Sequence, residues 1–195
     1  MSSPAGLRTC LYDQPALEWV MAAMASQIAA WARQHECVAL IGVLRRGAPL
    51  ADRLTERLVH EHGLPRPLRL DLSVKRYADD LTLLYPETRL DESAEHASLD
   101  LTGHHLMVVD DVLYQGYSIL KVLPYLTAKH PAEIRVATLV DRCVARLPVH
   151  ADVVGVRLQV APSDIVECHV PPYECAFQIL CVQPEREEVR AGLQP

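Results

Sequence analysis

The chain has 195 residues, of which 50% are hydrophobic, and its formal net charge is -6 at pH 7. This composition excludes a disordered chain, and the negative charge argues against a broad nucleic-acid-binding surface. No apolar run reaches the roughly 18 residues that a membrane-spanning helix needs. The amino terminus also lacks the charged segment and apolar core of a signal peptide. We therefore expect a single domain over residues 1–195 and a cytoplasmic location.

The amino-terminal part of the chain predicts a tail, a helix, a strand and a second helix. Residues 1–10 are small and polar, which is typical of a loose tail. Apolar residues recur at helical spacing over 15–35, and Asp13 is placed to cap this helix. The continuous apolar run at 37–43 predicts a buried strand, and 48–61 again has helical spacing.

The middle of the chain changes character twice. Residues 68–74 alternate as a strand does, whereas 76–102 are polar and acidic. A loop of that length in a compact domain is usually functional or disordered. The apolar run 106–109 then predicts a buried strand, and 118–129 predicts a helix that Pro124 should kink or shorten.

Three further strands are predicted, at 134–140, 152–156 and 176–182, before a charged tail at 184–195. Strand and helix therefore alternate through most of the chain. This alternation favours an α/β fold with a mainly parallel sheet flanked by helices. No glycine pattern of a dinucleotide-binding fold or of a P-loop is present.

The most informative segment is 107–118, an apolar strand followed by two acids and a short loop. Asp110 and Asp111 would lie at the carboxyl end of the strand, where open α/β sheets place their ligands. Carboxylates suit sugar hydroxyls or a hydrated Mg²⁺ ion. Gly116 lets the loop turn so that its amides face an anion, and Ser118 adds a hydroxyl at the start of the next helix. The alternative is a buried strand that ends in a solvated acidic turn.

Arginines follow two other predicted strands. Arg45, Arg46 and Gly47 come directly after the strand at 37–43, and guanidinium groups bind phosphate oxygens in pairs. This loop therefore suits a diphosphate, although two exposed arginines are the simpler alternative. Arg142 either contacts a phosphate or a base, or pairs with its neighbour Asp141.

The six cysteines do not form a standard metal-binding pattern. Cys168 and His169, with Cys175 and Cys181, invite a zinc interpretation, but their spacing fits no common site. We expect dispersed, buried thiols in a reducing compartment instead.

Segment 107–118 resembles the motif with which type I phosphoribosyltransferases bind 5-phosphoribosyl 1-diphosphate (PRPP). That motif is a hydrophobic strand, an acidic pair, a short spacer, Thr-Gly, one residue and Thr. The acidic pair and Gly116 match, whereas Gln115 and Ser118 stand where threonines are usual.

Within this family the chain is most similar to the PyrR proteins, pyrimidine operon regulators that are also uracil phosphoribosyltransferases. The resemblance covers about residues 12–182. It rests on four short sequence motifs and on their order in the chain. The first is 40–43 with Arg46-Gly47, and the second is Tyr77 with Asp79-Asp80-Leu81. The third is 109–114, and the fourth is 139–142 followed by Leu147-Pro148.

The resemblance implies a role for each segment. Asp110 and Asp111 would hold the ribose hydroxyls and, through water, Mg²⁺. Tyr77 would close the site as part of a mobile lid at 76–102. The segment 157–183 would comprise a hood that holds the base and the last strand. The 5-phosphate would be bound by Val112, Leu113, Tyr114, Gln115, Gly116, Tyr117 and Ser118. The pyrophosphate would be bound by Arg45, Arg46 and Gly47. Arg142 would contact the base or a phosphate.

The function implied is transfer of ribose 5-phosphate from PRPP to a nucleobase, with uracil giving UMP and pyrophosphate released. The family's diphosphate loop and lid carry polar residues where Leu44 and Ala78 stand here, and Gln115 replaces a threonine. A catalytically weakened sensor of PRPP or a nucleotide therefore remains an alternative, as does a purine phosphoribosyltransferase. Basic groups of the RNA-facing side are missing after Arg142, so RNA is not an expected partner. A homo-oligomer is the family expectation.

Overall fold

The computed structural model describes residues 6–74, 90–91 and 100–184, and its main feature is a six-stranded sheet. In spatial order the strands are β4 (Leu90–Asp91), β3 (Leu68–Val74), β2 (Val38–Leu44), β5 (His105–Leu113), β6 (Glu133–Asp141) and β7 (Val153–Arg157). The β3, β2, β5, β6 and β7 strands are parallel, and β4 pairs antiparallel with β3. The predicted α/β class with a mainly parallel sheet is confirmed.

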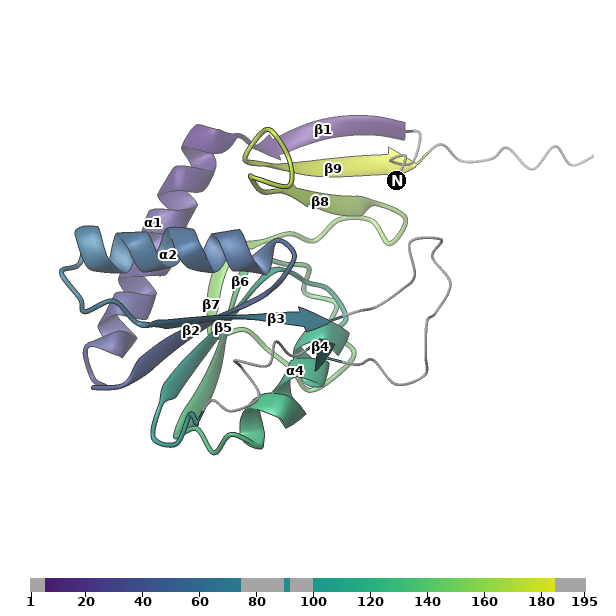
Figure 1. Ribbon diagram of the computed structural model, residues 1–195. Helices are drawn as coiled ribbons and strands as arrows, with labels where there is room; N and C mark the ends of the chain where they lie inside the picture. Colours follow the sequence, from purple (N-terminus) through teal and green to yellow (C-terminus); the bar gives the residue numbers. More distant parts are fainter. Residues whose placement is uncertain (1–5, 75–89, 92–99, 185–195) are drawn as a thin grey trace, which may run out of the picture.

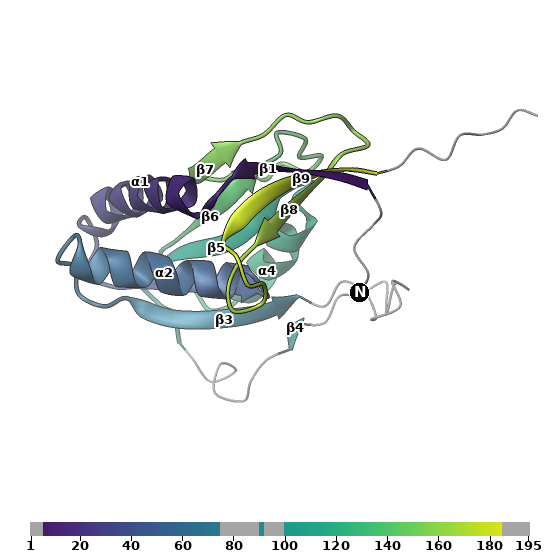
Figure 2. The ribbon, with the colours of Figure 1, turned by 90° about the horizontal axis from the view of Figure 1, so that it is seen from above.

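Helices cover both faces of this sheet (Figure 1). The α1 helix (Gln14–Ala32) and the α2 helix (Gly47–His60) lie on one face, and α4 (Tyr117–Thr127) lies on the other, as the view in Figure 2 also shows. Asp13 caps α1 as predicted, because its carboxylate accepts a hydrogen bond of 3.0 Å from the Ala16 N–H. Within the described ranges no helix combines the length and apolar character required to cross a bilayer.

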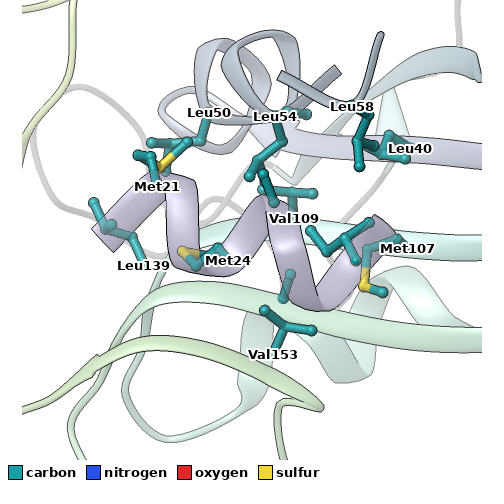
Figure 3. Packing of buried hydrophobic residues seen from close by; sticks show 14 of the residues in the cluster. Met21, Met24, Leu40, Leu50, Leu54, Leu58, Met107, Val109, Leu139 and Val153 are labelled. Atoms are coloured by element: carbon teal, nitrogen blue, oxygen red, sulfur yellow. The ribbon is translucent and has the colours of Figure 1, made fainter. Parts of the chain in front are cut away.

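Alternate residues of the central strands belong to two hydrophobic clusters, one on each face of the main sheet. Leu40 of β2 and Val109 of β5 belong to the cluster beneath α1 and α2, whereas Ile41 and Val108 belong to the cluster beneath α4. Figure 3 shows side chains of the first cluster, in which Leu54 of α2 packs among residues of the sheet and of α1. The central strands are therefore buried on both faces, which explains why their sequences are continuous apolar runs.

Truncation of Leu54 should be costly because this side chain is fully buried. We expect Leu54→Ala to lower the free energy of unfolding by about 2–5 kcal/mol, as deletion of a large core side chain does. Leu120→Ala on α4 is the control, because 41% of Leu120 is exposed, and it should cost about 0.5 kcal/mol. Urea unfolding measures both values. Equal costs would contradict a packed core beneath α2.

A second, three-stranded sheet of order β1-β9-β8 stands apart from the main sheet (Figure 1). It consists of β1 (Gly6–Tyr12), β9 (Gln178–Pro184) and β8 (Ile165–His169), all antiparallel. We call this sheet and its loops the hood. The hood is held to the main core because Cys168, Val170, Phe177 and Ile179 belong to the same cluster as α1 and α2.

One prediction about these segments was wrong. The tail predicted at 1–10 is a strand from Gly6 onward, because its backbone pairs with β9. Most of its side chains are exposed, so it carries no hydrophobic signal. In the segment predicted as a lid loop, residues 90–91 form β4, whereas Tyr77 and most of 76–102 lie outside the described residues.

Candidate functional site

A cavity of about 390 Å³ lies where β5 and β6 end and the hood begins. Its wall on the hood side is the segment 162–166, which leads into β8. Nine of the residues predicted to bind PRPP line it, namely Arg46, Asp110, Asp111, Val112, Leu113, Tyr114, Gly116, Ser118 and Arg142. Three separate segments of the sequence thus meet in one pocket. Of the other predicted residues that the structure describes, Gln115, Tyr117, Arg45 and Gly47 are not part of its lining.

The acidic pair belongs to β5 itself, because this strand runs on to Leu113 instead of ending at residue 109. Pairing with β6 continues to the end of β5, where Leu113 is opposite Asp141. The two acids are placed differently, since Asp110 is buried whereas Asp111 is half-buried. One carboxylate oxygen of Asp110 accepts a 2.9 Å hydrogen bond from the Asp111 N–H.

Electrostatics at Asp111 depend on its burial and on one cation. Burial raises the pKa of Asp111, and the nearby guanidinium of Arg46 opposes that shift. The Arg46 Nη1 atom lies 3.9 Å from the Asp111 Oδ2 atom. The pocket thus holds a carboxylate that a further positive charge would stabilise in its ionised form.

The loop after β5 has the geometry of an anion cradle. Gly116 adopts a left-handed conformation with φ of 88° and precedes the first residue of α4, Tyr117. Glycine takes this conformation without strain. The first amides of a helix have no partner within the helix and carry partial positive charge. Amides at the start of α4 and the Ser118 side chain are therefore available to an anion in the pocket.

The arginine loop after β2 reaches the pocket through one side chain. Arg46 lines the cavity, while the guanidinium of Arg45 lies over the ring of Tyr173, 5.4 Å from its centroid. Gly47 starts α2 and packs against the backbone of β5. A methyl group at Gly47 would overlap the carbonyl oxygen of Val109, so this close approach requires glycine.

Arg142 joins the end of β6 to the hood. It is 6% exposed, its Nη2 atom donates to the Asp164 carbonyl at 3.4 Å, and its guanidinium lies 5.3 Å from the centroid of the Tyr114 ring. Asp141 instead accepts a hydrogen bond from the Cys143 N–H and lies 4.0 Å from Arg157. The contacts of Arg142 therefore favour the interpretation in which it faces the pocket.

Two parts of the pocket region, β8 and Glu174, were not predicted from the sequence. The strand β8 was missed, although Ile165 and Val166 between turn residues at 162–163 and 171–172 are a short strand signal. Glu174 was missed as well. Its carboxylate binds Arg46, with the Arg46 Nε atom 3.1 and 3.2 Å from its two oxygens. A lone acid in an irregular loop gives no sequence signal for such a contact.

The thiols are less uniformly buried than expected. Cys168 and Cys181 are buried, but the other four are exposed, namely Cys10, Cys37, Cys143 and Cys175. Burial, with the nearby Asp111 carboxylate, raises the pKa of the Cys168 thiol well above its ordinary value. Cys168 is therefore a protonated core residue rather than a nucleophile.

A second polar cluster lies at the opposite, amino-terminal edge of the sheet. His35, His105 and Glu133 bring three potential metal ligands within 4.8 Å of one another. The two imidazole rings are stacked, with centroids 3.6 Å apart and 13° between their planes. Their in-plane lone pairs do not converge on one point, and Glu133 already accepts hydrogen bonds from Trp31 and Arg135. We therefore interpret this cluster as structural.

Glu133 should make stability depend on pH. Hydrogen bonds from Arg135, Trp31 and His105 lower the pKa of Glu133 from 4.5 to about 2. Its stabilising contribution is complete above pH 4.5 and is lost as the pH falls towards about 2. Because 30% of this side chain is exposed, we expect Glu133→Gln to cost only about 1 kcal/mol near neutral pH. Urea unfolding at several pH values should show that cost shrinking in acid; a constant cost would contradict the prediction.

Comparison with known proteins identifies the family of this chain. Residues 8–174 match the phosphoribosyl transferase domain family. The chain is 31% identical over 159 residues to the bifunctional protein PyrR of Listeria monocytogenes serotype 4a (strain HCC23), covering 80% of this chain and 85% of that protein. It is 36% identical over 136 residues to the bifunctional protein PyrR of Streptococcus pyogenes serotype M12 (strain MGAS2096), covering 69% of this chain and 72% of that protein.

Solved structures give the same fold. Hypoxanthine phosphoribosyltransferase from Trypanosoma cruzi, in complex with the product IMP, superposes with a TM-score of 0.69 at 17% identity, covering 94% of each chain. A second structure of the enzyme of that organism gives a TM-score of 0.67 at 19% identity, covering 91% of this chain and 97% of that one. The predicted resemblance is thereby confirmed, and this chain belongs to the phosphoribosyltransferase family.

Proposed function

We propose that this protein transfers ribose 5-phosphate from PRPP to a nucleobase, with uracil as the first candidate and UMP as the product. The observation that carries the proposal is the convergence of an acidic pair, an amide cradle and an arginine on one cavity. These three features match the three parts of PRPP, which are a ribose with two free hydroxyls, a 5-phosphate and a diphosphate. Curated relatives named as bifunctional PyrR proteins support the choice of uracil.

In this reaction the bond between C1 of the ribose and the pyrophosphate oxygen breaks, and its electron pair leaves with the pyrophosphate. A base nitrogen bonds to C1 and releases its proton to solvent. Positive charge develops on the ribose as the bond to pyrophosphate lengthens. We assign Asp110 and Asp111 to hold the ribose hydroxyls and to stabilise this charge, since fixed charges act most strongly in a partly dry pocket. Arg46 would take up the charge of the leaving pyrophosphate.

The 5-phosphate would bind to the loop 112–118, with backbone amides and the Ser118 hydroxyl as donors. The base would lie against the hood wall at 162–166. Arg142 lines the pocket together with the loop 112–118 and the hood wall, and it would donate a hydrogen bond to an oxo group of the base. Uracil and the oxopurines all carry such a group, so the base needs a direct test.

The acidic pair also fits a magnesium ion, because carboxylate oxygens are the ligands that Mg²⁺ takes in proteins. Asp110 and Asp111 would hold such an ion, directly or through its water shell. When bound, the ion would offset negative charge on the diphosphate. We also propose that the segment 76–102, with Tyr77, closes over the pocket as a lid and excludes water.

The test is release of pyrophosphate from PRPP with Mg²⁺, in separate reactions with uracil, hypoxanthine, guanine and no base. Uracil-dependent release supports the proposal, and release with a purine alone replaces uracil by a purine. PRPP binding without release for any base would support the second candidate, a PRPP or nucleotide sensor. Leu44, which stands where the family's diphosphate loop carries a polar residue, favours that candidate. Sedimentation of the protein tests the expected homo-oligomer.

A further inference from the structure

Glu174 extends from the hood to the arginine loop beside the pocket. It lies in the loop that joins β8 to β9, and its carboxylate accepts a hydrogen bond of 2.8 Å from the Val170 N–H. The same carboxylate accepts hydrogen bonds from the Nε atom of Arg46, at 3.1 Å to Oε1 and 3.2 Å to Oε2, and from the Nη2 atom. Its side chain is 20% exposed. The local turn thus holds an anion against the pyrophosphate loop.

Arg46 is engaged on two sides by carboxylates. One edge of its guanidinium binds Glu174, and its Nη1 atom lies 3.9 Å from the Asp111 Oδ2 atom. The neighbouring Arg45 lies over Tyr173 of the same hood loop. Both arginines proposed to bind pyrophosphate therefore contact the hood.

We propose that Glu174 is an internal occupant of the pyrophosphate subsite, which competes with the diphosphate of PRPP for Arg46. The inference rests on the proposed function. PRPP must exchange the carboxylate of Glu174 for phosphate oxygens when it binds. After transfer the carboxylate returns to Arg46 and assists the departure of pyrophosphate.

The physical basis is that an edge of a guanidinium offers one pair of parallel N–H donors, which one anion fills. A second anion on the same edge would lack donors and would be repelled by the first. Hydrogen bonding to Glu174 raises the pKa of Arg46, and hydrogen bonds from Arg46 and Val170 lower the pKa of Glu174 against the effect of burial. Both groups are therefore charged near neutral pH, so the competition is between anions.

The decisive variant is Glu174→Gln, which keeps the shape of the side chain and removes its charge. We expect the Kd for pyrophosphate and for PRPP, measured by calorimetry with Mg²⁺, to fall about 10-fold, because a charge-assisted competitor becomes a neutral one. The KM for PRPP should fall as well, and pyrophosphate should become a stronger product inhibitor. A lower kcat would accompany these changes if release of pyrophosphate limits turnover.

The matched control is Glu167→Gln in β8. Glu167 is a hood carboxylate of nearly the same exposure, 19%, but it pairs with Arg8 at 3.7 Å and with His169 at 3.5 Å. Its substitution should leave the Kd for pyrophosphate unchanged. Thermal unfolding of both variants establishes that any change in affinity is not a change in folding.

The outcomes separate the inference from the proposed function. If the native protein binds pyrophosphate and Glu174→Gln binds it equally or more weakly, Glu174 positions Arg46 instead of competing for it, and the inference is overturned alone. If neither protein binds pyrophosphate or PRPP, the proposed function fails and the inference fails with it. Tighter binding by Glu174→Gln, with Glu167→Gln unchanged, supports both.

Discussion

Asp111→Asn should lower the rate of PRPP-dependent pyrophosphate release by about 10²–10³-fold, the usual effect of removing one positioned polar group from a reacting centre. Asparagine keeps the shape of the side chain but removes the charge that would face the ribose. Arg46, whose Nη1 atom lies 3.9 Å from Asp111, would lose one of its two carboxylate neighbours. A coupled assay for pyrophosphate measures the rate.

The free energy of unfolding of Asp111→Asn should change little, although its activity falls. Burial raises the pKa of Asp111, so the charged form is disfavoured in the pocket, and its neutral replacement should not lower the free energy of unfolding by more than about 1 kcal/mol. Asp100→Asn is the control for activity, since Asp100 is exposed, accepts hydrogen bonds from its neighbour Thr102 and is not part of the pocket lining. Near-native turnover by Asp111→Asn would remove Asp111 from the proposed mechanism.

Gly47→Ala is expected to be severely damaging although it adds only one methyl group. The added methyl group would meet the carbonyl of Val109 and would lie 3.2 Å from the Cα atom of Asp110. Because both neighbours are backbone of β5, relief requires α2 or β5 to move. We expect a loss of about 3 kcal/mol in the free energy of unfolding, as in other overpacked cores. Activity should fall even in the folded fraction, because the displaced strand carries the acidic pair.

Gly63→Ala provides the comparison at the other end of α2. Gly63 has φ of 64°, and a methyl group there would meet no heavy atom within 4 Å. Its cost should be about 1–2 kcal/mol, from the left-handed backbone alone, with full activity. Denaturant unfolding and the pyrophosphate assay, applied to both variants, test the difference. A smaller stability loss for Gly47→Ala than for Gly63→Ala would contradict the close packing of α2 against β5.

The sequence predicts the parallel sheet well because its strands are buried on both faces. Runs such as 37–43 and 106–109 have few polar residues and cannot be mistaken for surface segments. The β1 and β8 strands were missed for the opposite reason. Most side chains of β1 are exposed, so its conformation comes from backbone pairing with a distant segment, which leaves no periodic pattern in the sequence.

The same contrast holds for the pocket. Asp110, Asp111, Gly116 and Ser118 lie close together in the chain, so their spacing alone predicts a shared site. The contact from Glu174 to Arg46 joins two loops that only the tertiary fold brings together. Reading β5 as ending at residue 109 placed the acids after the strand, whereas pairing with β6 carries the strand past them.

The pairing of β1 with β9 has a consequence for how the molecule assembles during synthesis. The first and last strands that the structure describes are neighbours in one sheet. A ribosome delivers β1 long before β9, so β1 must wait unpaired while the main sheet, whose strands are made in between, folds without it. The hood wall of the pocket is then the last part to form. A nascent chain halted before β9 should already hold its acidic pair in place but lack the surface against which a base would bind.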